Sequence, residues 1–167
     1  MTSWIVISWR GFETAWLERG GLESAFRSLV RRNPQTGGWP TRGMPLLQFD
    51  TTLSLSAEEK TALADRVTEL YTTEMATTAG HVAVTIRERE SADLHLGRAV
   101  EGPLVFLDAE IRRGRPFDRK RAFAVATMAF LGETFDVPDE NMKVVFTDHP
   151  GKSMMGVDRV GGEWDGE

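Results

Sequence analysis

The sequence predicts an α+β domain built from a tandem β-α-β repeat, with four strands in one sheet and two helices on one face. Two observations lead to this prediction: segments recur in the same order at a nearly constant offset, and strand-like apolar runs alternate with runs of helical periodicity. The openings PLLQFD at Pro45 and PLVFLD at Pro103 are 58 residues apart. The helix starts LSAEEK and RPFDRK, and the second apolar runs HVAVTI and NMKVVF, are each 60 residues apart. The repeats therefore cover residues 45–90 and 103–148.

In the first half, the helix is expected to begin at Ser56. Serine is a favoured N-cap, and Glu59 three residues later completes a capping box that satisfies backbone donors of the first turn. The apolar residues that follow at helical spacing form one face. They are Leu63, Val67, Leu70 and Tyr71.

In the second half, Pro116 suits the first helical position, because its fixed φ matches a helix and its missing N–H is not needed there. Asp118 suits the first turn, where the helix dipole favours a carboxylate. The apolar face continues through Phe123, Thr127, Phe130 and Leu131. The run DVPDEN then ends the helix, since the residue before a proline disfavours helical backbone.

The two units are expected to share one sheet. Strands joined through a helix usually lie parallel, by a right-handed crossover. Both helices then lie on one face, and the opposite face needs another cover. The simplest cover is another copy of the chain.

Residues 1–43 differ in composition from the rest. They hold four of the five tryptophans, none of the four lysines and a net charge of +3, whereas residues 44–167 carry −8. The run NPQTGGWPTRG, dense in Gly and Pro, indicates a linker. Residues 1–43 are therefore interpreted as an N-terminal extension, which is an accessory arm, a propeptide or upstream sequence translated from a misassigned start. Residues 44–167 form the predicted domain.

Several classes of protein are disfavoured by composition. There is no cysteine, which excludes disulfides and a cysteine nucleophile and is compatible with a reducing cytoplasm. No apolar run is long enough for a membrane span, and no basic region precedes the short apolar start of a secretory signal. The acidic body argues against nucleic-acid binding. The three histidines, His81, His95 and His149, lack metal-ligand spacing, so neither a metal nor a cofactor is expected. A cytoplasmic location is expected.

A tandem β-α-β chain whose first strand opens with Met44-Pro45 resembles the tautomerase superfamily, the MIF-like fold of 4-oxalocrotonate tautomerase and malonate semialdehyde decarboxylase. The likeness runs from Met44 to about Trp164. It is closest to the cis-3-chloroacrylic acid dehalogenase branch, through IRRGRPFDRK at Ile111, VVFTDHP at Val144 and GGEW at Gly161. The resemblance implies a homotrimer that buries the bare sheet faces. It also implies removal of the initiator methionine, so that the exposed proline nitrogen is catalytic.

Pro45 is the candidate catalytic base. Inside a chain its nitrogen is an amide, whose lone pair is delocalised and takes no proton. At a free N-terminus it is a secondary amine, and an α-amino group titrates near pH 8 or below when cations or desolvation act on it. Such a base suits proton transfer beside a carbonyl. The alternative is that Pro45 only begins an edge strand.

Arg112 and Arg115 are the candidate substrate-binding and catalytic cations. They flank Gly114 in a turn that leads into a helix, where guanidinium groups and backbone donors suit a carboxylate. The resemblance implies that both hold the carboxylate of the substrate. A solvated basic loop is the alternative. Arg113, Arg119 and Arg121 are assigned to the surface.

Tyr71 stands where the dehalogenase branch carries a histidine, and it is a candidate hydrogen-bond donor or a packed residue of the helix face. The water-activating tyrosine and glutamate of that branch are replaced here by Val145 and Gly156. Asp158 and Asp148 lie near these positions but out of register. Hydrolytic dehalogenation is therefore disfavoured, whereas an amine base with arginine anchors suffices for keto–enol tautomerisation.

The function predicted by the sequence is proton transfer on a small 2-oxo acid by an exposed Pro45. One alternative is hydration, decarboxylation or dehalogenation of a small unsaturated or β-keto acid, with Asp158 or Asp148 activating water. The other is a non-catalytic trimer in which residues 1–43 keep Pro45 blocked.

Overall fold

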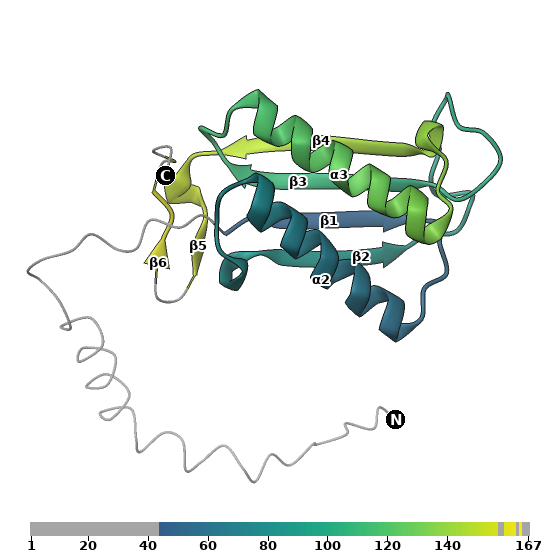
Figure 1. Cartoon of the computed structure of the whole chain (residues 1–167), viewed down its shortest axis with the longest axis horizontal. Helices are drawn as coiled ribbons and strands as arrows, with labels where there is room; N and C mark the ends of the chain where they lie inside the picture. Colours follow the sequence, from purple (N-terminus) through teal and green to yellow (C-terminus); the bar gives the residue numbers. More distant parts are fainter. Residues whose placement is uncertain (1–43, 157–158, 163, 165–167) are drawn as a thin grey trace, which may run out of the picture. The chain divides into compact units, whose positions relative to one another are not determined.

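The computed structural model describes residues 44–156, 159–162 and 164. The prediction for residues 1–43 and the candidate Asp158 lie outside these residues. Figure 1 shows two β-α-β units joined into one layer of strands with two helices packed across it. The α+β repeat predicted from the sequence is confirmed.

The first unit consists of β1 (Leu46–Thr51), α2 (Ala57–Glu74), the short helix η1 (Ala79–His81) and β2 (Ala83–Glu88). The second consists of β3 (Val105–Arg112), α3 (Phe117–Phe135), η2 (Asp139–Asn141) and β4 (Met142–His149). A last segment adds η3 (Gly151–Ser153), β5 (Met155–Gly156) and β6 (Arg159–Val160). The described part of the chain contains no helix with the length and hydropathy needed to cross a membrane.

The sheet has the strand order β2-β1-β3-β4. Within each unit the strands are parallel, as the crossover rule predicts. The two units meet along β1 and β3, which are antiparallel, with Leu46 opposite Glu110. This pairing brings the start of β1 and the end of β3 to the same end of the sheet.

The ends of the helices follow the expected capping chemistry, with one difference. The side chain of Ser56 accepts from the backbone N–H of Glu59 (3.2 Å), and the carboxylate of Glu59 accepts from the backbone N–H of Ser56 (2.8 Å), so the capping box is present. Pro116 is the N-cap of α3 and not its first helical residue. Its ψ of 152° is extended and lies outside the helical range. Asp136 ends α3 in the left-handed conformation.

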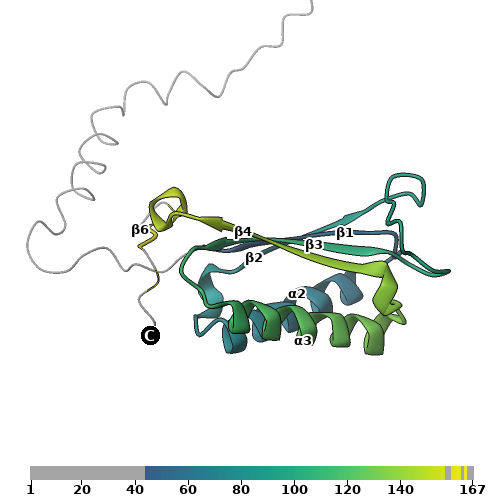
Figure 2. The same ribbon diagram turned by 90° about the horizontal axis from the view of Figure 1, so that it is seen from above.

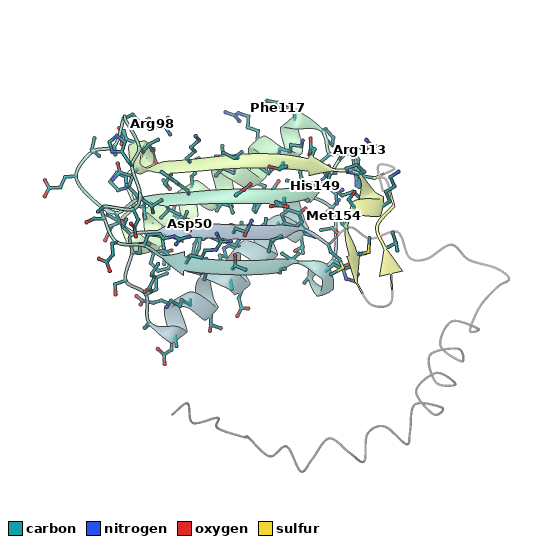
Figure 3. The ribbon with its side chains drawn as sticks, turned by 180° about the vertical axis from the view of Figure 1, so that it is seen from behind. Asp50, Arg98, Arg113, Phe117, His149 and Met154 are labelled. Atoms are coloured by element: carbon teal, nitrogen blue, oxygen red, sulfur yellow. The ribbon has the colours of Figure 1, made fainter. Side chains whose placement is uncertain are left out.

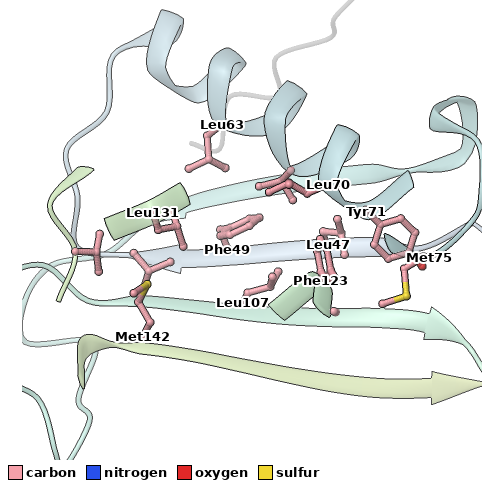
Figure 4. Close-up of a cluster of buried hydrophobic side chains, with 14 of the residues drawn as sticks. Leu47, Phe49, Leu63, Leu70, Tyr71, Met75, Leu107, Phe123, Leu131 and Met142 are labelled. Atoms are coloured by element: carbon pink, nitrogen blue, oxygen red, sulfur yellow. The ribbon is translucent and has the colours of Figure 1, made fainter. Parts of the chain in front are cut away.

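Both helices cover one face of the sheet (Figure 2). Their apolar faces meet alternate residues of the strands and form one core, shown in Figure 4. The largest side chains of this core are less than 3% exposed; they include Leu47, Phe49, Leu63, Tyr71, Leu107 and Phe123. This core fixes the strands whose ends carry the candidate site.

The opposite face of the sheet has no helix over it (Figure 3). Its side chains are polar and apolar in mixture, and some polar groups pair across strands: Asp50 binds Arg89 at 2.7 Å, and Gln48 accepts from Arg87. Among the described residues, the buried atoms Thr85 Oγ1 and Asp108 Oδ1 on this face have no hydrogen-bond partner. The face is therefore incompletely satisfied within one chain.

Candidate functional site

Pro45 immediately precedes β1 and is buried. Its carbonyl accepts from the backbone N–H of Ala83 (3.0 Å), which extends the β1–β2 pairing by one residue and fixes the proline. Next to it lies a cavity of about 320 Å³, here called the Pro45 cavity. The cavity is lined by Met44, Pro45, Leu46, Ala83, Glu110, His149, Ser153, Met154 and Met155.

Arg112 and Arg115 lie at this same end of the sheet. Arg112 is the last residue of β3, is 8% exposed, and its Nη1 donates to the carbonyl of Gly162 (3.1 Å). Arg115 precedes α3 and is 7% exposed. Gly114 between them has a φ of +105°, a backbone conformation that glycine adopts without strain. The structure therefore places the two predicted cations on one turn but covers both, and neither lines the Pro45 cavity.

Arg115 has structural partners that its sequence context does not reveal. Its Nε donates to the carbonyl of Met75 (3.0 Å), the C-cap of α2, and its Cζ lies 5.2 Å from the ring centroid of Trp164. Burial lowers the pKa of Arg115, although a guanidinium remains charged. Among the described residues, its buried Nη1 makes no hydrogen bond. An anion that accepts a hydrogen bond from such a buried, unsatisfied donor gains more binding free energy than one bound by an exposed donor.

Tyr71 lies in the core at the end of α2. It is 2% exposed and meets the ring of Phe123 edge-on, with centroids 5.2 Å apart. Burial raises the pKa of Tyr71 to about 12, against a smaller opposing effect of Arg115 and Arg112. The phenol is therefore neutral at ordinary pH, and any part it takes in chemistry is as a hydrogen-bond donor.

Of the two acids considered as water activators, only Asp148 lies among the described residues. Asp148 forms an ion pair with Lys120 of α3. Val145 is 44% exposed on the opposite face of β4, and Gly156 belongs to β5. Arg119 was assigned to the surface, but it is partly buried and donates to the carbonyl of Glu74 (2.7 Å), which satisfies the last turn of α2. Arg113 and Arg121 are exposed, as expected.

Sequence reasoning missed the pairing of Glu110 with His149. Nε2 of His149 lies 3.0 Å from Oε2 of Glu110, and Nε2 of Gln48 donates to Oε1 of the same carboxylate (3.3 Å). Both Glu110 and His149 line the Pro45 cavity. The signal was strand alternation: Glu110 lies two residues before Arg112 on β3, hence on the same face. Among the described residues, no group of three His, Asp or Glu side chains is arranged to hold a metal ion.

Comparison with known proteins gives structural matches only. No protein-family model matches the chain, and no curated protein matches it. A solved structure of N1, a member of the cis-3-chloroacrylic acid dehalogenase family, has a TM-score of 0.64 and 22% identity over 71% of this chain and 84% of that one. Pt0534 inactivated by 2-oxo-3-pentynoate has a TM-score of 0.61 and 21% identity over 69% of this chain and 95% of that one.

A third match is F6, a fused 4-OT described as a wild-type asymmetric trimer, with a TM-score of 0.59 and 19% identity over 69% of this chain and 94% of that one. Three proteins with the same arrangement of strands and helices, each covered over most of its length, agree with the architecture described above. They include a member of the dehalogenase branch that the sequence resembles. The fold that the resemblance implies is thus confirmed.

Proposed function

We propose that this chain is an acid–base isomerase that moves a proton beside the carbonyl of a small 2-oxo acid, with Pro45 as its base once the nitrogen is freed. The observation that carries the proposal is Arg115, a buried cation with a donor that no described residue satisfies, at the end of the sheet where Pro45 lines a cavity. Arg112 lies three residues away on the same turn. Two such cations match the carboxylate and adjacent carbonyl oxygen of a 2-oxo acid.

In this proposal the proline, the two arginines and the tyrosine have separate chemical roles. The free secondary amine of Pro45 takes a proton from one atom of the enol and returns it to another. Arg112 and Arg115 hold the carboxylate and stabilise the negative charge that develops on the oxygen. Tyr71, neutral because its pKa is about 12, donates a hydrogen bond at most. Small 2-oxo acids as ligands are supported by Pt0534, a protein of this fold that 2-oxo-3-pentynoate inactivates.

Self-association into a trimer is part of the proposal. The sheet face without helices is open among the described residues (Figure 3), with Val145 44% exposed on it, and a second copy would cover it. Fused 4-OT forms trimers with this fold. In this proposal residues 44–167 form the catalytic unit, and residues 1–43 decide whether Pro45 is blocked.

A second candidate is a trimer that does no chemistry. Its support is the sequence itself: Met44 precedes Pro45 and lines the same cavity, so in the intact chain the proline nitrogen belongs to an amide. Hydration or decarboxylation, which needs an activated water, has weaker support, because the carboxylate of Asp148 is engaged by Lys120.

The test compares the intact chain with a chain whose first residue is Pro45, both checked for fold by circular dichroism. Ketonisation of phenylenolpyruvate or 2-hydroxymuconate is followed by absorbance, and covalent labelling by 2-oxo-3-pentynoate is followed by mass spectrometry. The proposal expects activity and labelling only when Pro45 is N-terminal. Equal activity of the intact chain shows that a free proline nitrogen is not needed. Two folded but inactive proteins favour the non-catalytic trimer.

A further inference from the structure

The Pro45 cavity holds a second pair of groups that can carry a proton. Glu110 comes from the β3 strand and His149 is the last residue of β4, and Figure 3 shows His149 and Met154 at the same end of the open sheet face. Nε2 of His149 lies 3.0 Å from Oε2 of Glu110. The roles assigned above to Pro45 and the two arginines leave this pair unused.

Glu110 is itself held in place. Nε2 of Gln48, on the neighbouring strand β1, donates to its Oε1 at 3.3 Å, and its Oε2 lies in ion-pair contact with Nε2 of His149 at 3.0 Å, without the geometry of a hydrogen bond. A carboxylate that engages one imidazole nitrogen fixes the ring and leaves the other nitrogen as the one that exchanges protons. Gln48, Glu110 and His149 therefore form a chain of three side chains across β1, β3 and β4.

The surroundings of His149 contain few other titratable groups among the described residues. On β3 these are Glu110 and Arg112, the latter paired in register with His149. On β4, Asp148 is engaged by Lys120 on the helix side. Lys152 of η3 is exposed, and the rest of the wall is Ser153, Met154 and Met155. Pro45 adds an amine when its nitrogen is free.

We propose that His149, positioned by Glu110, is a second proton-transferring residue of the Pro45 cavity. This inference rests on the proposed function. This inference refines the roles given above: in ketonisation His149, not Pro45, takes the proton of the enol hydroxyl, and the O–H electron pair becomes the C=O π bond. The C=C electron pair takes a proton from the Pro45 ammonium and forms the new C–H bond. The proton on His149 then returns to Pro45 through solvent, so there is no net uptake or release.

This division of labour has a physical reason. Histidine is the side chain whose ordinary charge change falls between about pH 5 and 8, so it both accepts and returns a proton near neutrality. A single amine acting alone must move between the oxygen and the carbon of the substrate. Two groups on separate strands, Pro45 before β1 and His149 at the end of β4, reach both atoms without that movement.

The test uses whichever form of the chain is active in the preceding comparison. His149→Gln is expected to lower kcat about 100-fold, with KM changed less than about threefold, and to change the pH profile of kcat/KM. Glu110→Gln is expected to lower kcat less, and Glu110→Asp to restore part of it. The matched control is Lys152→Gln, which changes an exposed charge of η3 and is expected to leave both parameters unchanged.

A second measurement does not depend on turnover. Nitrogen NMR of the full chain resolves the imidazoles of its three histidines, and the signals absent from His149→Asn identify His149. Glu110→Gln is expected to change the tautomer balance of that imidazole, whereas Lys152→Gln is not. An active protein whose kcat and pH profile survive His149→Gln, or an unchanged tautomer balance in Glu110→Gln, overturns the inference and leaves the proposed function standing. Folded protein that is inactive in every form contradicts both this inference and the proposed function.

Discussion

The guanidinium carbon of Arg115 lies 5.2 Å from the centre of the Trp164 ring. A cation at this distance from an indole face is attracted by the ring quadrupole, more strongly where water is excluded. Beside it, Nη1 of Arg112 donates to the carbonyl of Gly162 (3.1 Å). The segment after β6 therefore contacts both candidate substrate-binding cations, and it sets how much water reaches them.

Replacing Trp164 by alanine is expected to weaken binding of 2-oxo acids. Arg115 would lose a contact worth about 1 kcal/mol and gain hydration, so its attraction for a carboxylate would fall and KM would rise roughly fivefold. Trp164→Phe keeps a ring over the guanidinium and serves as the matched control, with a smaller rise. The measurement is KM for ketonisation in the form with Pro45 free. A fall in KM would instead show that Trp164 obstructs the arginines.

Asn141 is expected to hold in place the loop between the two β-α-β units. It is fully buried, its Nδ2 donates to the carbonyls of Val100 (3.0 Å) and Pro103 (3.1 Å), and its Oδ1 accepts from the N–H of Val100 (2.8 Å). Asn141→Ala leaves these backbone groups without partners and is expected to lower the free energy of unfolding by about 2–4 kcal/mol. Urea unfolding measures this value.

The control for that experiment is the preceding residue. Glu140 has an exposed side chain, so Glu140→Ala is expected to change the free energy of unfolding by no more than about 0.5 kcal/mol. Equal effects of the two substitutions would show that the hydrogen bonds of Asn141 do not hold this loop.

Tyr71 is the only tyrosine in the chain, so its ionisation can be followed directly by ultraviolet absorbance. Burial raises the pKa of Tyr71 to about 12 from its ordinary value of 10.0. Absorbance of the folded chain is therefore expected to show tyrosinate only near pH 12, and that of the urea-unfolded chain near pH 10. A folded midpoint near 10 would show that the phenol is hydrated.

The same shift predicts how stability depends on pH. Because the pKa is higher in the folded state, the contribution of neutral Tyr71 is fully present below pH 10 and is lost as the pH rises toward 12. The loss amounts to roughly 3 kcal/mol. Tyr71→Phe is expected to remove this part of the alkaline destabilisation, which urea unfolding at pH 8 and pH 11 measures.

The fold was predictable because its signals are local or repeated. The capping box of Ser56 and Glu59 and the apolar faces of the two helices depend only on residues within one or two turns of each other. The constant offset between the halves indicated two similar units. The offset does not determine how the units join, and the antiparallel pairing of β1 with β3 came only from the structure.

The candidate site was predictable only in part. Pro45, Arg112 and Arg115 were proposed from the Met-Pro opening, the arginine turn and the family resemblance, and their roles remain predictions. The contacts of Arg115 with Met75 and Trp164 join residues far apart in the sequence, and no local pattern encodes them. Glu110 and His149 were missed for the same reason, since they meet only when β3 and β4 pair. Pro116 was placed one residue too far into its helix because proline suits both positions.

Gly161 is expected to be the residue that lets the last segment dock. Its N–H donates to the carbonyl of Met154 (2.7 Å), and a Cβ at this position would lie 2.4 Å from the carbonyl oxygen of Gly151 and 3.0 Å from that of Met154. Carbonyl oxygens of the backbone cannot move aside as a flexible side chain does. Gly161→Ala therefore forces this segment away from η3.

Because Gly162 and Trp164 follow directly, that displacement is expected to release the contacts that cover Arg112 and Arg115. Gly161→Ala should expose the backbone after β6 to faster amide hydrogen exchange and destabilise the packing by about 1–3 kcal/mol. Gly97→Ala is the matched control, since a Cβ there has nothing within 4 Å. Unchanged exchange after β6 in Gly161→Ala, with both variants equally stable, would show that this close backbone approach does not hold the segment.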